Sequence, residues 1–146
     1  MDRLDRAIIN QLQGSGRLTN QELADRVGLT PAPCLRRVRR LEAEGVITGY
    51  TALVNPAALG RDFEVIIYAD LVAKDLATVA SFEERLVAMD EVAELRRMFG
   101  IPDYFIRVQT ADLAAYEQWL SIKLMGDPAI ARVDSRLTMK LLKSRR

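Results

Sequence analysis

Four arginines within five positions form the densest concentration of charge in this sequence. If this segment is helical, Leu35, Val38 and Leu41 gather on one side, and we expect Arg36 and Arg40 to point the opposite way. Guanidinium groups presented in this manner suit phosphates and the edges of guanine bases. The alternative is a solvated basic helix face that binds no ligand, so the neighbouring elements must decide between the two interpretations.

Two helix signals flank a tight turn just before this cluster. A capping box formed by Thr19 and Glu22 predicts a short helix over residues 20–27, which Gly28 ends. Proline at the first position of a helix predicts that the next one runs over residues 31–44. A helix, a short turn and a second helix are the pattern of a helix-turn-helix, which favours DNA binding for the arginine cluster.

A further helix, capped by Asp2 or Asp5, precedes this pair and completes a predicted DNA-binding domain over residues 1–46. In helix-turn-helix proteins the N-terminal part of the last helix enters the major groove. Glu42 and Glu44 confine the basic stretch to that part. The residues predicted to bind DNA are Thr30, Ala32, Pro33, Arg36, Arg37, Arg39 and Arg40.

The rest of the chain alternates between strand and helix patterns. Residues 47–61 are predicted to form a short strand (47–54) and a hinge, followed by a second domain over residues 62–146. Its order, β-α-β-β-α-β, predicts a ferredoxin-like arrangement and an α+β protein. Strands are expected over 63–72, 91–99, 104–109 and 132–141, with helices over 77–89 and from residue 112 onward.

Two helices can cover only one face of such a sheet. The other face would present Ile66, Tyr68, Val72 and Met98 beside charged residues. A partly apolar open face favours pairing with a second copy of the chain.

Composition excludes several kinds of chemistry. The chain has no histidine and one cysteine, which removes Ser-His-Asp and Cys-His catalysis and nearly all zinc sites. Cys34 could be a reactive thiol, but a small packed residue is the favoured interpretation. We expect no catalytic residue, metal or cofactor, hence not an enzyme. No apolar run is long enough for a membrane span and no signal peptide is evident, so a cytoplasmic protein is expected.

The segment from Leu29 to Pro56 resembles the recognition helix and linker of the Lrp/AsnC (feast/famine) transcriptional regulators, leaning toward the leucine-responsive branch. Leu4-Asp5 matches the family's opening, and the loop from Gly100 to Tyr104 is similar to its Gly-x-x-Asp-Tyr motif. The resemblance covers essentially the whole chain. It implies homodimers joined through the β-rich halves, often assembled four at a time into octamers, with free amino acids as common effectors.

The loop around Asp103 has the chemistry that a free amino acid requires. A glycine turn offers N–H donors for a carboxylate, and Asp103 offers an acceptor for an ammonium; the alternative is a simple turn in which Asp103 caps its own backbone. Family members often carry an acidic residue after the glycine, but Ile101 and Pro102 stand here. This departure predicts an effector with an apolar or aromatic side chain, or weak binding overall, rather than a lysine- or arginine-like ligand. The effector-binding residues that the resemblance implies are Gly100, Asp103, Tyr104 and Ser135.

Three further interpretations remain open in the sequence. Tyr116 and Trp119 could contact an effector, although core packing is favoured for apolar residues at helical spacing. The basic tail over residues 140–146 could touch DNA, although a solvated tail is favoured. The expected function is a sequence-specific DNA-binding transcriptional regulator that responds to a small molecule. The alternative is an architectural DNA-binding oligomer without an effector.

Overall fold

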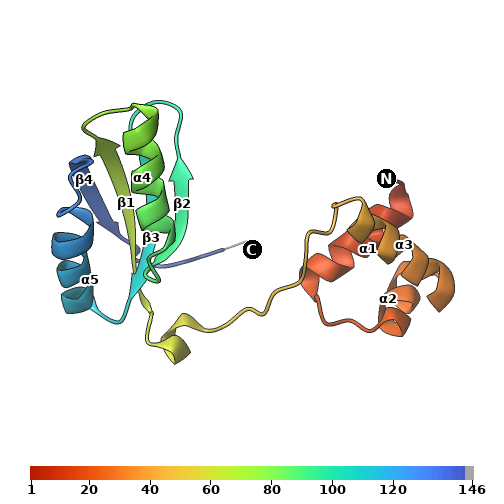
Figure 1. Cartoon of the computed structure of the whole chain (residues 1–146). Coiled ribbons are helices and arrows are strands. Elements are labelled where there is room, and N and C mark those ends of the chain that lie inside the picture. Colours follow the sequence, from red (N-terminus) through yellow and green to blue (C-terminus); the bar gives the residue numbers. More distant parts are fainter. Residues whose placement is uncertain (144–146) are drawn as a thin grey trace. The chain divides into compact units, whose positions relative to one another are not determined.

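The computed structural model describes residues 1–143 and contains two compact units, Met1–Leu53 and Val54–Arg146 (Figure 1). Each unit has a hydrophobic core of its own. Among the residues that the structure describes, no helix is long and apolar enough to cross a membrane. The tail residues 140–143 are exposed and form no regular element, and residues 144–146 of the predicted tail lie outside the described part.

The first unit consists of three helices: α1 (Arg3–Gly14), α2 (Asn20–Val27) and α3 (Pro31–Ala43). Asp2 is the N-cap of α1, and Asp5 completes its capping box. The capping box of Thr19 and Glu22 that begins α2 is also present. These local signals place all three helices close to their predicted bounds.

The core of this unit is small and fully apolar apart from one thiol. Its buried side chains are Ile8, Leu23, Ala24, Cys34 and Leu41. Leu35 is predicted to share the apolar side of α3 with Val38 and Leu41, but it is exposed, and Cys34 is buried in the core instead. Burial raises the pKa of the Cys34 thiol, which keeps it protonated and agrees with a packing role.

The segment that follows α3 differs from its prediction. Residues 47–54 form no strand, because no other segment of the described chain pairs with their backbone. The segment is held instead by side chains: the Tyr50 hydroxyl donates to Glu42 Oε1 over 2.9 Å. A single 3₁₀ turn, η1 (Pro56–Leu59), then lies at the start of the second unit.

The second unit is a four-stranded antiparallel sheet with strand order β2-β3-β1-β4 (Figure 1). This order confirms the ferredoxin-like arrangement and the α+β class. Its elements are β1 (Phe63–Leu71), α4 (Leu76–Val87), β2 (Val92–Arg97), β3 (Tyr104–Thr110), α5 (Leu113–Trp119), the π-helical turn η2 (Leu120–Leu124) and β4 (Ile130–Leu137).

The sheet packs both of its helices on one face. Alternate residues of β1, from Val65 to Leu71, are buried against Phe82 and Leu86 of α4 and against α5. Tyr116 and Trp119 belong to this core, so the packing interpretation of these two aromatic residues is confirmed.

The opposite face of the sheet carries the intervening residues of β1, including Ile66 and Tyr68. Two further residues predicted there, Val72 and Met98, come directly after the ends of β1 and β2 and are exposed. The last strand is also shorter than predicted, since β4 ends at Leu137. Tyr68 packs edge-on against Phe105 of the neighbouring strand, with the Arg136 guanidinium over its ring.

Candidate functional site

The turn between α2 and α3 is built from backbone and one amide side chain. Gly28 adopts a left-handed conformation (φ 70°), which favours glycine and lets the Leu29 N–H reach the Ala24 carbonyl over 2.9 Å. The Asn20 side-chain amide donates to the Pro31 carbonyl over 2.8 Å and so ties the start of α2 to the start of α3. The two helices therefore meet at a fixed turn.

The N-terminal end of α3 presents short side chains. Thr30 and Ala32 are exposed, and Pro33 is half-buried. Thr30 is the N-cap residue, yet its side chain makes no capping hydrogen bond. The partial positive charge of a helix N-terminus favours a phosphate at this end.

The four arginines of α3 divide into two pairs. Arg36 and Arg39 are exposed and, within residues 1–143, form no ion pair. Arg37 and Arg40 turn toward α1 and bind its acidic N-terminus. Arg40 is exposed as predicted, but its guanidinium is not free, because it binds a buried carboxylate on α1.

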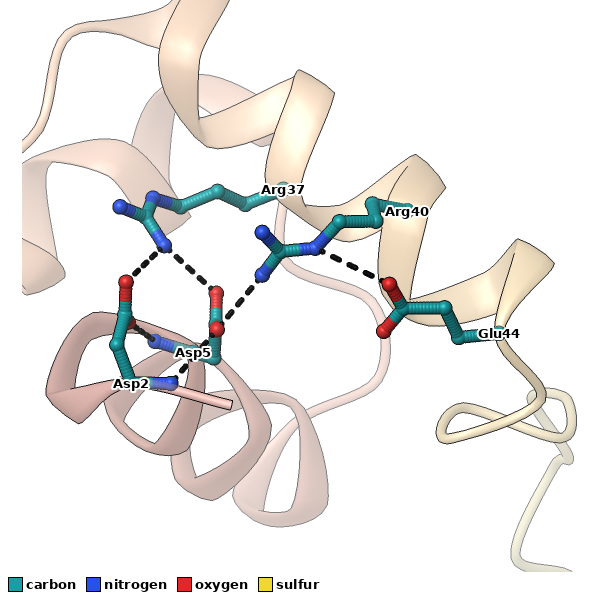
Figure 2. Close-up of polar contacts among 5 residues, drawn as sticks. All are labelled: Asp2, Asp5, Arg37, Arg40 and Glu44. Atoms are coloured by element: carbon teal, nitrogen blue, oxygen red, sulfur yellow. Dashed lines mark hydrogen bonds and ion pairs between the residues drawn. The ribbon is translucent and has the colours of Figure 1, made fainter.

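That carboxylate belongs to Asp5, which Figure 2 shows hydrogen-bonded to both Arg37 and Arg40. The Asp5 side chain is 1% exposed. Asp5 Oδ1 accepts from Arg37 Nη1 over 2.8 Å, and Oδ2 accepts from Arg40 Nη2 over 2.6 Å. Arg37 Nη1 also reaches Asp2 Oδ2 over 2.7 Å. Glu44 Oε1 lies 3.7 Å from Arg40 Nε. Arg37 and Arg40 are thus paired with three carboxylates in all, those of Asp2, Asp5 and Glu44.

The pKa of Asp5 follows from these contacts. A hydrogen bond from the Asp2 N–H and the two guanidinium groups outweigh the effect of burial and lower the pKa to about 2. The lowered pKa means that ionised Asp5 stabilises the fold above the ordinary carboxyl range near pH 4, and that this stabilisation is lost as the pH falls through about 2.

We therefore expect the difference in unfolding temperature between the native chain and Asp5→Asn to be largest near neutral pH and to shrink between about pH 4 and pH 2. Far-ultraviolet circular dichroism measures the helices. Fluorescence of Trp119, which lies in the second unit, should shift far less and serves as the internal control. A difference that stays constant across this pH range would contradict the assignment.

The second unit contains a pocket of about 320 Å³ where the loop between β2 and β3 meets the end of β1. Its wall is mostly apolar, with two cations and one carboxylate. The lining residues are Leu71, Lys74, Val79, Arg97, Met98, Phe99, Gly100, Ile101, Asp103 and Tyr104. Three of the four residues predicted to bind an effector thus line one pocket.

Asp103 is buried in the wall of this pocket and is already paired. Its Oδ1 lies 2.6 Å from Lys74 Nζ, and its Oδ2 accepts from the Leu71 N–H over 3.0 Å. Burial raises the pKa of Asp103, but Lys74 and the Leu71 N–H outweigh it, so the carboxyl is ionised at neutral pH. The pocket therefore places a cation and an anion side by side.

Tyr104 lines the pocket with its ring while its hydroxyl is committed elsewhere. The hydroxyl donates to Glu83 Oε1 over 2.7 Å, and the same carboxylate binds Arg97 through two contacts of 2.6 Å. Burial and the neighbouring Glu83 raise the pKa of Tyr104 to about 12, so it stays protonated. Glu83 thus holds the polar groups of Tyr104 and Arg97 in place at one side of the pocket.

Ser135 lies apart from these residues within one chain. It sits on β4, at the sheet edge opposite β2, and its hydroxyl is 2.6 Å from the Tyr116 hydroxyl. Lys74 and Arg97, by contrast, were missed by sequence reasoning. Lys74 lies in the loop between β1 and α4, far from the glycine turn in sequence, and only the fold brings it to the pocket. Arg97 ends β2 just before the glycine turn, so its position in the sequence was a signal that could have found it.

The chain matches two family models that together cover most of its length. Residues 1–48 match the winged helix-turn-helix DNA-binding model, and residues 64–146 match the Lrp/AsnC ligand-binding domain. The chain belongs to the Lrp/AsnC family. It is 37% identical to the leucine-responsive regulatory proteins of Klebsiella pneumoniae and of Escherichia coli K12 over 98% of its own length and 87% of theirs.

Solved structures of other Lrp/AsnC proteins have the same fold. A transcriptional regulator from Neisseria meningitidis, crystallised with L-Met, matches with a TM-score of 0.94 at 29% identity over 99% of this chain and 94% of that one. An AsnC family regulator from Agrobacterium tumefaciens matches with 0.92 at 33% identity over the same shares of the two chains. This Lrp/AsnC chain is thus a transcriptional regulator with a DNA-binding domain and a ligand-binding domain.

Proposed function

We propose that the exposed face of α3 reads operator DNA and that the pocket around Asp103 binds the effector. The observation that carries this proposal is the pairing, in one chain, of an exposed arginine pair on a helix-turn-helix with a pocket that holds adjacent opposite charges. Direct contacts are assigned to Thr30, Ala32, Pro33, Arg36 and Arg39. Such a regulator needs no catalytic group and acts in the cytoplasm.

The proposed effector is a free amino acid with an apolar side chain. Lys74 suits its carboxylate, Asp103 suits its ammonium, and Leu71, Val79 and Ile101 offer apolar surface for its side chain. The likeness to a regulator crystallised with L-Met and to leucine-responsive proteins supports this class.

A screen of the free amino acids by thermal unfolding tests the effector. A ligand at 100 times its Kd adds about 2.7 kcal/mol to the free energy of unfolding, so the true effector should raise the unfolding temperature clearly. We expect leucine, methionine or an aromatic amino acid to give the largest rise. An effector role requires, in addition, that the same compound changes operator affinity or oligomeric state. Without either change, the architectural alternative is favoured.

Homodimers are proposed to form through the open face of the sheet, where Tyr68, Phe105 and their arginine neighbours lie uncovered by helices in the described residues. A dimer reads two half-sites about one helical turn apart, so its operator is expected to be roughly palindromic. Light scattering should give the mass of a dimer or of a multiple of it, such as an octamer. A monomer at micromolar concentration would contradict this assembly.

A further inference from the structure

The arginines of α3 form two rows with different surroundings. Arg37 and Arg40 are three residues apart and so lie on one side of the helix, and Arg36 and Arg39 form a second row one residue away. Arg37 and Arg40, the inner row, bind carboxylates at the start of α1, although Arg40 is itself exposed. Arg36 and Arg39, the outer row, are exposed and form no ion pair within residues 1–143. Sequence spacing makes the two rows look equivalent, and only the tertiary contacts distinguish them.

Asp5 is the residue that separates the rows. Both of its carboxylate oxygens are used, one by each inner arginine, and its side chain is almost completely buried between α1 and α3 (Figure 2). Asp2 adds a second carboxylate to Arg37. Two acidic side chains thus offset the two positive charges of the inner row.

This arrangement limits what Arg37 and Arg40 can offer to DNA. Moving either guanidinium toward a phosphate would leave the buried Asp5 carboxylate with one partner fewer, and an uncompensated buried charge is strongly unfavourable. Arg36 and Arg39 carry no such restraint. Their charge is available to phosphates and bases.

We propose that Asp5 is a positioning residue for DNA recognition, which holds Arg37 and Arg40 against α1 so that α3 presents only Arg36 and Arg39 to DNA. This inference rests on the proposed function of α3. It assigns Arg37 and Arg40 to orienting the helix and removes them from the contact set that the sequence predicts.

Holding Arg37 and Arg40 away from DNA should increase the preference of the protein for its operator over other DNA sequences. Contacts between arginine and phosphate strengthen binding to every DNA sequence, so two additional mobile guanidinium groups would raise non-specific affinity more than operator affinity. Holding them in ion pairs with Asp5 and Asp2 lowers the affinity for competing sites. A merely structural role for Asp5 would change folding stability without changing this ratio.

Asp5→Asn in the full chain tests the proposal. Asparagine keeps an oxygen that can accept the Asp2 N–H but removes the charge that holds the two arginines. We measure the affinity for an operator fragment and for a scrambled duplex between 50 and 200 mM salt. The slope of the logarithm of the binding constant against the logarithm of the salt concentration (the salt slope) should steepen by about one to two. Each additional phosphate contact contributes about 0.9 to this slope. Affinity for the scrambled duplex should rise about ten-fold or more, and the specificity ratio should fall.

Glu22→Gln is the matched control. It removes one negative charge from a capping box of the same helical unit, but Glu22 contacts no arginine of α3. Its slope should stay within about half a unit of the native value. If Glu22→Gln steepens the slope as much as Asp5→Asn, general charge explains the effect and the proposal is overturned.

Arg37→Gln and Arg36→Gln provide a second test that does not require the Asp5 variant to fold. Arg36→Gln should lower the slope by about one, and Arg37→Gln should leave it nearly unchanged. Equal decreases in both variants would overturn the role of Asp5 while leaving DNA binding by α3 intact. If the native chain binds no DNA, or if Arg36→Gln changes nothing, the proposed function of α3 itself fails.

Discussion

Replacing both Arg36 and Arg39 by alanine should reduce operator affinity by about 30-fold to 25,000-fold. An arginine that reads a base contributes about 1–3 kcal/mol, and the two side chains point outward from α3 without any ion pair within residues 1–143. The fold of the helical unit should be unaffected, because neither side chain belongs to its core. Fluorescence anisotropy with an operator duplex, at a fixed salt concentration, measures the loss.

Lys140→Ala combined with Lys143→Ala is the matched control, since it removes the same charge from the exposed tail. The tail double variant should bind within a few-fold of the native chain. If it loses as much affinity as the α3 double variant, the tail contributes to DNA binding as well. Sequence-specific binding that survives intact in the α3 double variant would remove α3 from the interface.

Local sequence signals account for most of the helical unit. The capping boxes of Asp2 with Asp5 and of Thr19 with Glu22, the turn at Gly28 and the proline at the first position of α3 each act within four residues. Their structures therefore follow from spacing alone. The same holds for the alternating burial of β1, which fixes the face that the helices cover.

Long-range contacts account for what the sequence could not predict. Asp5 and Arg40 are 35 positions apart, so no local pattern shows that the capping residue of one helix also binds the guanidinium of another. The same reason applies to Lys74 and Asp103, which are joined by the fold of the sheet. In both cases a charged side chain has a specific partner that is distant in the sequence.

The error over residues 47–54 has a different origin. Their β-branched content predicts an extended backbone, but a strand also needs a neighbour with which to exchange hydrogen bonds. No described segment of this chain provides one. Propensity alone therefore over-predicted a strand where Tyr50 makes a side-chain contact with Glu42.

Asp103→Ala should weaken effector binding at least 100-fold. If Asp103 receives the ammonium of an amino acid in the partly desolvated pocket, its loss leaves that ammonium unpaired, and breaking a buried pair costs about 3–5 kcal/mol. The Lys74 and Leu71 contacts leave unused lone pairs on the carboxylate, so the ammonium and the existing partners can share it. DNA binding by the effector-free protein should change little, because the helical unit has a separate core.

The alanine variant also removes the acceptor of the Leu71 N–H, so a second variant must separate charge from loop structure. Asp103→Asn keeps an oxygen for that N–H and should retain an unfolding temperature near the native one, yet lose most of the effector affinity. Isothermal titration calorimetry with the amino acid selected by the thermal screen measures both variants. The apolar lining, with Ile101 and Pro102 in place of an acidic residue and an N–H donor, should make an apolar or aromatic amino acid bind more tightly than lysine or arginine. Native-like affinity in Asp103→Asn, or tightest binding of a basic amino acid, would exclude Asp103 as the ammonium acceptor.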